Sequence, residues 1–198
     1  MHPFEPNYQQ NSKELIKLYE QSLRHGKNLY FDSDSFETII MHYIEVSELE
    51  KAMEVCDRAM EQHPYVVFFM LKRADLLIML ENYEEAESLL NKASLLEPYS
   101  DEIFFLLGYL YDDKGELEKA VDFYKKSLEI APERDDVIMS LVYAYESMDQ
   151  YEEAASLLRG MLEKDSEDIQ AIYELAHCFD MLGNPEESIS FYEKIINN

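Results

Sequence analysis

The sequence predicts an all-α fold in which helical hairpins of one fixed length stack into an array. The first observation is that Pro64, Pro98 and Pro132 stand at equal intervals in the chain (98 − 64 = 34 and 132 − 98 = 34). The second is direct self-similarity, because the stretch NYEEAESLL that starts at Asn82 returns as QYEEAASLL from Gln150, two periods later. A fixed period of this length is the signature of a helical repeat architecture.

The period divides the chain into an N-terminal region and five units. Residues 1–11 contain two prolines and few apolar side chains, so we expect an extended or mobile segment. Residues 12–25 carry leucines at helical spacing and are followed by Gly26, which predicts a helix. This helix would cap the first unit, although a degenerate half-unit fits the pattern equally well. With each proline at position 32, the units are 33–66, 67–100, 101–134, 135–168 and 169–198.

Each unit is predicted to hold two helices that cross at recurring positions. Position 20, on the second helix, holds Ala52, Ala86, Ala120, Ala154 and Ser188. Position 8, its expected neighbour on the first helix, holds Ile40, Ala74, Gly108, Val142 and Ala176. Bulky apolar residues recur at positions 4 and 11 on one face of the first helix. In the last unit, Asn184 and Pro185 start the second helix as an N-cap residue and a proline at the first helical position.

These columns resemble the tetratricopeptide repeat family, whose 34-residue unit has Leu-Gly near positions 7 and 8, Tyr at 11, Ala at 20, an aromatic residue at 24 and Pro at 32. The third unit carries the pattern best, with Phe104, Leu107, Gly108, Tyr111, Ala120, Tyr124 and Pro132. The resemblance covers residues 33–198 and implies a right-handed superhelix of five repeats. The departures from the pattern are Arg73 in the Leu column, Cys56 in the aromatic column, Ser166 for the fourth proline and Pro185 for the usual Tyr.

The composition is strongly acidic. There are 42 Asp and Glu against 17 Lys and Arg, a formal net charge of −25. Phosphate backbones and anionic lipid surfaces would be repelled, so we expect no nucleic-acid partner, and the similar pentatricopeptide RNA binders are disfavoured. The acidity either keeps an elongated surface soluble or steers a basic partner towards it.

Cysteine usage and hydropathy bear on the compartment. Cys56 and Cys178 lie in non-adjacent units, which favours reduced, buried thiols. The longest apolar run, from Ile103, is far shorter than a membrane span, and the N-terminus has no signal-peptide pattern. We therefore expect one elongated domain in the cytoplasm, without membrane insertion.

Patterns that would indicate catalysis or metal binding are absent from the sequence. His42, His63 and His177 fall at different positions of their units and do not have the spacing of a two-histidine zinc site. The acidic strings from Phe31 and from Asp112 lack the ligand pattern of a calcium loop, and they are better explained as an N-cap and a turn. We expect no enzyme activity, no metal and no cofactor.

The resemblance implies that the first helix of each unit faces the concave side, where positions 2, 5, 9, 12 and 13 line a groove. In this chain those columns form a band of aromatic residues bordered by carboxylates, as a peptide-binding groove needs. The predicted groove residues are Phe68, Leu71, Asp75, Phe105, Tyr109, Asp112, Met139, Tyr143, Glu146, Tyr173 and His177. Phe105 and Met139 could equally fill the interior of a tight superhelix, whereas the tyrosine hydroxyls favour exposure.

The partner expected in this groove is a peptide or helix with Lys or Arg and apolar side chains, because carboxylates border the aromatic band. A clamp for a terminal carboxylate is not expected. Chaperone-tail binders of the family carry Lys and Asn at positions 5 and 9 of a first unit, where this chain has Glu37 and Met41.

Three functions remain open from the sequence. The first is a non-catalytic scaffold that binds a partner protein in the groove. The second is structural self-assembly through the last helix, where a following helix would be expected to cover Tyr192, Ile195 and Ile196. That face implies either a fragment of a longer array or a homodimer. The third is a docking or regulatory fragment of a longer tetratricopeptide repeat protein.

Overall fold

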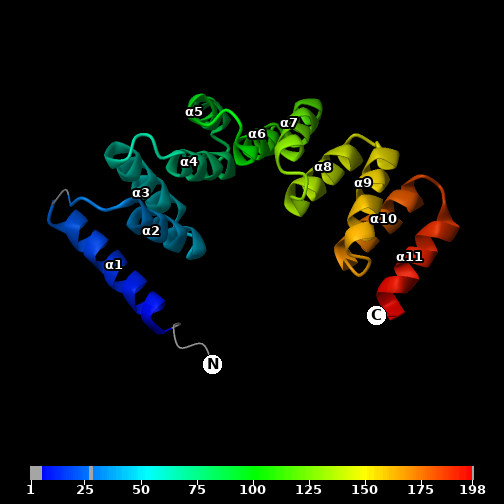
Figure 1. Cartoon of the computed structure of the whole chain (residues 1–198), viewed down its shortest axis with the longest axis horizontal. Coiled ribbons are helices and arrows are strands. Elements are labelled where there is room, and N and C mark those ends of the chain that lie inside the picture. Colours follow the sequence, from blue (N-terminus) through cyan, green and yellow to red (C-terminus); the bar gives the residue numbers. More distant parts are fainter. Residues whose placement is uncertain (1–5, 27–28, 198) are drawn as a thin grey trace. The chain divides into compact units, whose positions relative to one another are not determined.

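The computed structural model describes residues 6–26 and 29–197, and over these residues the chain forms eleven α-helices and no strand (Figure 1). The prediction of an all-α fold is confirmed. The helices are α1 (Pro6–Arg24), α2 (Ser33–Glu45), α3 (Leu49–Gln62), α4 (Val67–Met79), α5 (Tyr83–Leu96), α6 (Asp101–Asp113), α7 (Leu117–Ile130), α8 (Asp135–Ser147), α9 (Tyr151–Lys164), α10 (Ile169–Met181) and α11 (Pro185–Asn197).

The chain divides into two compact units, residues 1–97 with α1 to α5 and residues 98–198 with α6 to α11. The sequence, which shows no linker, predicted one elongated domain instead. Each hairpin of a repeat array packs mainly on its neighbours, so no common core ties all the hairpins together. The boundary between two compact units can therefore fall in a short turn, even where the sequence is not rich in the Gly, Pro or Ser that is typical of a linker.

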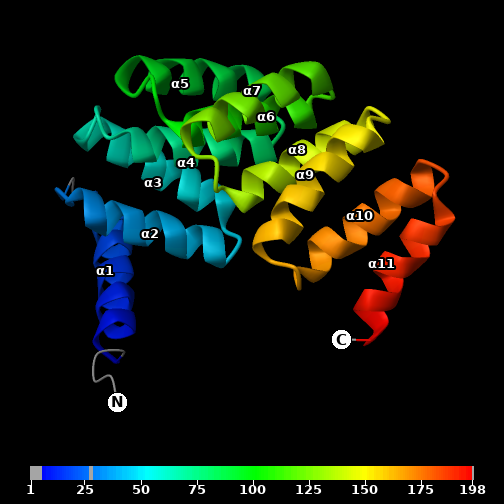
Figure 2. The ribbon, with the colours of Figure 1, turned by 45° about the vertical axis from the view of Figure 1, so that its right-hand side comes forward.

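After α1, consecutive helices pair as hairpins: α2 with α3, α4 with α5, α6 with α7, α8 with α9 and α10 with α11 (Figures 1 and 2). The first helices of these pairs begin at the spacing of the sequence period (67 − 33 = 34 for the first two). They start at Ser33, Val67, Asp101, Asp135 and Ile169.

The turn inside each hairpin has the same backbone form. One residue per turn has a left-handed φ, and the next amide donates to a carbonyl five residues earlier, as Asn82 N does to Leu77 O at 2.8 Å. This closes the end of the first helix in the manner of a Schellman cap. The left-handed residues are Ser47, Glu81, Gly115, Asp149 and Gly183. The turn expected in the acidic string from Asp112 is thus present, with Gly115 as its left-handed residue, but three of the five positions do without glycine.

The N-terminal helix is longer than the sequence predicted. Residues 6–11 were expected to be extended or mobile, but α1 already begins at Pro6. Proline is tolerated at the first helical position, where its missing N–H has no helical partner in any case. The rest of the predicted mobile segment, residues 1–5, lies outside the described residues. Ile16 and Tyr19 of α1 are buried in a core that includes Phe36 of α2.

The crossing positions predicted from the columns are buried. The alanines of the position 20 column are fully inaccessible, and Ser188 is 2% exposed. In the third hairpin the first helix lacks a side chain at Gly108, where an added Cβ would lie 2.5 Å from the ring of Tyr124. Tyr124 is fully buried there. Small residues at these positions therefore set the close approach of the two helices.

One departure from the family pattern has a clear structural explanation. Arg73, in the column where Leu is usual, lies on α4 and is mostly buried. Its Nε is 2.5 Å from Asp57 Oδ1 of α3, and its Nη1 is 2.7 Å from Glu85 Oε1 of α5. The guanidinium links three helices by charge-assisted hydrogen bonds in place of apolar packing.

Candidate functional site

Three tyrosines are exposed on the first helices of the second unit. Tyr109 of α6, Tyr143 of α8 and Tyr173 of α10 are 38%, 40% and 52% exposed. They occupy the predicted groove columns, and the helix period places them on the side of each helix opposite the hairpin core. Exposed tyrosines combine a large contact area with a hydroxyl that bonds to water or to a partner.

The hydroxyl of Tyr143 is held in place by α10. Gln170 Nε2 donates to it at 2.9 Å, and the hydroxyl donates to Glu174 Oε1 at 3.2 Å. Burial raises the pKa of Tyr143 above its ordinary value, and the charge of Glu174 raises it further. The ring is therefore presented at the surface in a fixed position.

Glu146 lies deeper, between α8 and α10. It is half-buried, and Cys178 Sγ donates to its Oε1 at 3.4 Å. Burial raises the pKa of the Glu146 carboxyl, and the neighbouring charge of Glu174 raises it further. Burial also raises the pKa of Cys178 to about 12, so the thiol stays protonated near neutral pH. His177 is half-buried and makes an edge contact with the ring of Tyr151, their ring centroids 6.2 Å apart.

Tyr173 and Tyr192 lie against each other. The sequence assigned Tyr173 to the groove and Tyr192 to a separate end face, yet their ring centroids are 5.8 Å apart in an edge arrangement. Tyr192 and Ile195 are half-buried, whereas Ile196 is 81% exposed. Tyr192 of α11 thus lies directly beside the exposed Tyr173 of α10.

Other predicted groove residues of the second unit are less accessible. Met139 is buried, which favours the alternative that the sequence left open, in which its side chain fills the interior. Phe105 is half-buried, and the Arg134 guanidinium lies over its ring, 4.8 Å from the centroid. Asp112 is half-buried and accepts a hydrogen bond from the Tyr124 hydroxyl at 3.2 Å. Burial raises the pKa of this carboxyl.

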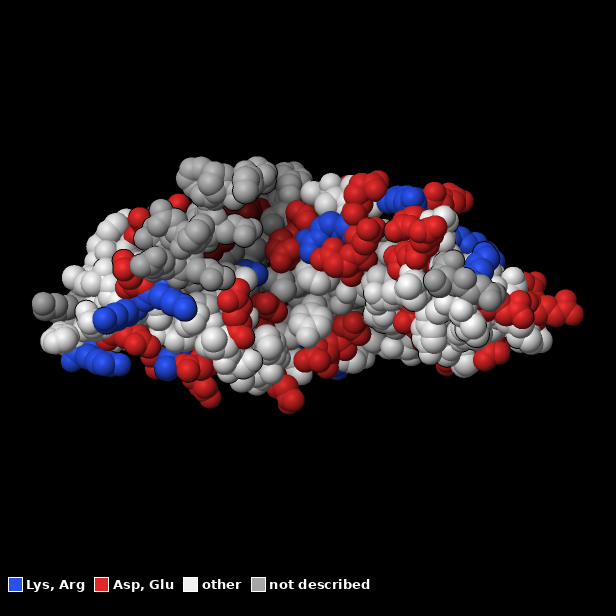
Figure 3. Space-filling view, turned by 90° about the horizontal axis from the view of Figure 1, so that it is seen from below, with Lys and Arg blue, Asp and Glu red and all other residues white. Residues whose placement is uncertain are grey.

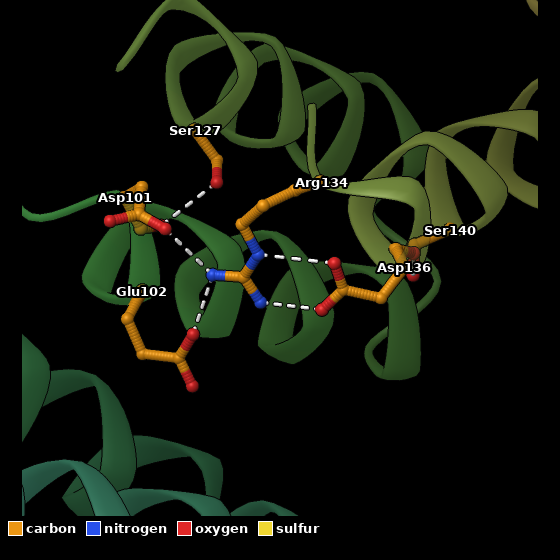
Figure 4. A network of polar contacts seen from close by, with 6 residues as sticks. All are labelled: Asp101, Glu102, Ser127, Arg134, Asp136 and Ser140. Atoms are coloured by element: carbon orange, nitrogen blue, oxygen red, sulfur yellow. Dashed lines mark hydrogen bonds and ion pairs between the residues drawn. The ribbon is translucent and has the colours of Figure 1, made fainter. Parts of the chain in front are cut away.

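Arg134 forms a network that sequence reasoning missed (Figure 4). It lies in the turn before α8 and its Nη1 is 2.9 Å from Asp101 Oδ2 and 2.6 Å from Glu102 Oε2 of α6. Its Nε and Nη2 donate to both carboxylate oxygens of Asp136 at 3.1 and 2.5 Å. Hydrogen bonding to Arg134 lowers the pKa of Asp136. The one sequence signal was a lone Arg within the acidic run from Glu133 to Asp136.

The predicted groove residues of the first unit lie on α4. Phe68, Leu71 and Asp75 are all half-buried. The ring of Phe68 is 5.6 Å from that of Phe69, and Lys72 Nζ lies 5.6 Å from the Phe68 centroid. These three positions carry one aromatic side chain, that of Phe68, and Lys72 already lies over its ring.

Acidic side chains are spread over the face of the molecule seen in Figure 3, where basic side chains form only a few small groups. Among the described residues, no group of three or more His, Cys, Asp or Glu is arranged to hold a metal ion. None of the helices in the described part of the chain has the length and apolar character needed to cross a membrane.

Solved structures share the fold. MamA aligns with a TM-score of 0.70 at 18% identity, over 85% of this chain and 95% of MamA. YrrB, described as a TPR protein with an unusual peptide-binding site, gives 0.64 at 18% identity over 94% of this chain and 92% of YrrB. PilF from Pseudomonas aeruginosa gives 0.73 at 15% identity over 83% of this chain and 75% of PilF.

A comparison with curated protein sequences gives no match. The family model of the tetratricopeptide repeat matches residues 8–198, which is nearly the whole chain. The repeat spacing, the paired helices and the buried small-residue column agree with that match. The chain belongs to the tetratricopeptide repeat family.

Proposed function

We propose that this protein is a non-catalytic scaffold that holds a basic and apolar segment of a partner protein on its tyrosine surface, formed by Tyr109, Tyr143 and Tyr173. One observation carries the proposal. The helices that present these rings, α6, α8 and α10, contain four, three and two Asp or Glu and not one Lys or Arg. Every Lys and Arg of the second unit lies on its second helices or in its turns.

The chemistry of this surface favours a Lys or Arg of the partner. Glu174 is close enough to Glu146 to raise the pKa of its carboxyl, and α8 and α10 supply no Lys or Arg to neutralise the two. A basic side chain placed there would relieve the repulsion and form charge-assisted hydrogen bonds. The rings of Tyr143 and Tyr173 would cover the apolar part of the segment and add cation–π attraction. YrrB is described as having a peptide-binding site, which supports such a use of the shared fold.

The test measures binding of labelled peptides in which Lys or Arg alternate with Leu or Phe, against peptides with Glu in place of the bases. Fluorescence anisotropy gives Kd for the native chain and for Tyr143→Ala and Tyr173→Ala. Each variant should weaken binding of the basic peptide about tenfold, as removal of an interface anchor does. Tyr65→Ala and Tyr99→Ala are matched controls, because these tyrosines are 81% and 85% exposed in turns between hairpins. Equal losses in all four variants, or preference for the Glu peptide, would refute the assignment.

A second candidate function is self-association through α11. Ile189 and Ile196 are 57% and 81% exposed, and their spacing of seven residues puts them on one face of the helix. Burial of such a face against a second copy would form a homodimer. Sedimentation velocity should then show a dimer that Ile196→Glu converts to a monomer. A native chain that stays monomeric at about 100 µM would exclude this function at physiological concentrations.

A further inference from the structure

Arg134 is the N-cap residue of α8, where a cation is locally unfavourable. The N-terminal end of a helix carries a partial positive charge, so a guanidinium there is repelled. Across α2 to α10, whose N-caps are all described, every other N-cap residue is neutral or acidic. Asp32 and Asp168 at two of them accept amide hydrogen bonds, which arginine cannot do. Residues that oppose the local preference of their helix are expected at functional sites.

The guanidinium of Arg134 is enclosed by acceptors from two helices (Figure 4). Its Nη1 contacts Asp101 and Glu102 of α6, and its Nε and Nη2 take both carboxylate oxygens of Asp136 of α8. The ring of Phe105 lies 4.8 Å from the guanidinium carbon. A forked carboxylate pairing together with an aromatic face selects a planar guanidinium over the ammonium group of lysine. We call Asp101, Glu102, Phe105 and Asp136 the arginine cluster.

The arginine cluster is held in place by contacts that do not involve Arg134. The backbone carbonyl of Asp101 accepts from the buried Ser127 Oγ of α7 at 2.9 Å (Figure 4). Asp101, Glu102 and Asp136 also stand in the first turns of α6 and α8, where the helix dipole favours carboxylates. Removal of the guanidinium should therefore leave three carboxylates close together, and their mutual repulsion would favour another cation.

The arginine cluster shares its helix faces with the proposed tyrosine surface. Glu102 and Tyr109 are seven residues apart on α6 (109 − 102 = 7), and Asp136 and Tyr143 are seven apart on α8 (143 − 136 = 7). Seven residues are two helical turns, so each carboxylate and tyrosine lie on the same side of their helix. The side chains of Asp101, Glu102 and Asp136 are 33%, 39% and 55% exposed, so a partner on this face can reach them.

We propose that the arginine cluster binds an arginine side chain of the partner protein, and that Arg134 is an internal ligand that closes it in the free chain. A partner arginine enters by exchange with Arg134, so that one guanidinium replaces another and the charge of the cluster is unchanged. Arg134 thereby lowers the affinity of the free chain for a basic segment. The position of the partner rests on the proposed function, but the affinity of the cluster for an arginine does not.

The first experiment tests the arginine cluster alone, with N-acetyl-L-arginine amide and its lysine analogue as probes of the full chain. In Arg134→Ala the arginine probe, at about 10 mM, should raise the thermal midpoint by about 3 °C or more if its Kd is about 1 mM. The lysine probe should do less, and the native chain should not distinguish the two. Asp136→Asn added to Arg134→Ala should abolish the preference for arginine.

Lys164→Ala is the matched control, because it also removes one positive charge beside the same turn, where Lys164 Nζ is 2.6 Å from Glu133 Oε2. It should behave as the native chain does. If circular dichroism shows that Arg134→Ala is unfolded, Arg134→Gln, which keeps an aliphatic stem near Phe105, replaces it.

The second experiment measures Kd for labelled basic peptides that alternate Leu with Arg, and for twins with Lys in place of Arg. Arg134→Ala should tighten binding of the Arg peptide about tenfold, as a new charge-assisted fork does, and that of the Lys twin less than about threefold. Equal gains for both peptides, or the same gain in Lys164→Ala, would reduce the effect to net charge and overturn the proposal. So would an Arg134→Ala chain that shows no preference between the two small probes. Arginine-selective binding of the small probe without binding of any basic peptide would confirm the arginine site and refute the proposed function.

Discussion

At the scale of single residues, the structure makes a sharp distinction between two glycines. Gly108 has no room for a methyl group, because the new Cβ would lie 2.5 and 2.6 Å from two ring carbons of the fully buried Tyr124. Gly160, within α9, has nothing within 4 Å of its Cβ position. We expect Gly108→Ala to lower the free energy of unfolding by about 1–3 kcal/mol through overpacking. Gly160→Ala should raise it by about 1 kcal/mol through helix propensity. Urea unfolding followed by circular dichroism measures both, and changes of the same sign would contradict the packing described for Gly108.

Glu146 gives a prediction about pH. Burial raises the pKa of its carboxyl in the folded protein above that in the unfolded chain. The folded state therefore binds this proton more tightly, so the carboxyl favours folding when protonated and loses that contribution as pH rises through the folded pKa. Glu146→Gln should raise the thermal midpoint at pH 7, and the gain should shrink as the pH falls through the acidic range. Glu193→Gln, at an exposed site on α11, should show no such trend. A Glu146→Gln protein that is less stable than the native protein at pH 7 would show that the carboxylate is stabilising.

Individual side chains of the candidate site were only partly predictable. The exposure of Tyr109, Tyr143 and Tyr173 followed from their columns and hydroxyls. The burial of Met139 did not, because an apolar residue in a groove column fits the core equally well. The Arg134 network was also missed, since it joins a turn to the start of α6, a full hairpin earlier in the chain. Such a long-range pairing depends on how hairpins pack, which a column of residue types does not encode.

At the scale of elements, the hairpin turns carry a testable strain. Glu81 has a φ of 58° in the turn between α4 and α5. A left-handed conformation costs a residue with a Cβ roughly 1 kcal/mol, and glycine adopts it freely. Glu81→Gly should therefore raise the free energy of unfolding by up to about 1 kcal/mol. The same change at Glu54, an exposed position inside α3, should lower it by about 1 kcal/mol. Parallel chemical denaturation of the two variants checks the opposite signs, and a destabilised Glu81→Gly would show that the turn is not strained.

The elements themselves were largely predictable because their signals are local. The period predicted where each first helix begins, and Asp32 caps α2 by accepting from Ser35 N at 2.8 Å, as expected of that acidic string. Pro185 begins α11, as the start signal indicated. The start of α1 was missed because Pro6 was taken as a sign of extended chain, while proline is equally suited to the first turn of a helix. Composition alone does not distinguish these two uses of proline.

At the scale of the whole molecule, the dominant property is the net charge of −25, which opposes folding and, through the same carboxylates, would attract the basic partner that we propose. Added salt screens both effects, because the Debye length falls from about 30 Å at 0.01 M to about 10 Å at 0.1 M. We therefore expect the thermal midpoint of the free chain to rise between about 0.01 and 0.3 M NaCl, while the affinity for a basic peptide falls over the same range. Differential scanning fluorimetry and anisotropy titrations in the same buffers measure the two trends. Sodium sulfate must be avoided, since it strengthens burial by exclusion from the protein surface. If stability and basic-peptide affinity both rose with NaCl, apolar contacts would dominate the interface, and the carboxylates of α6, α8 and α10 would not be what selects the partner.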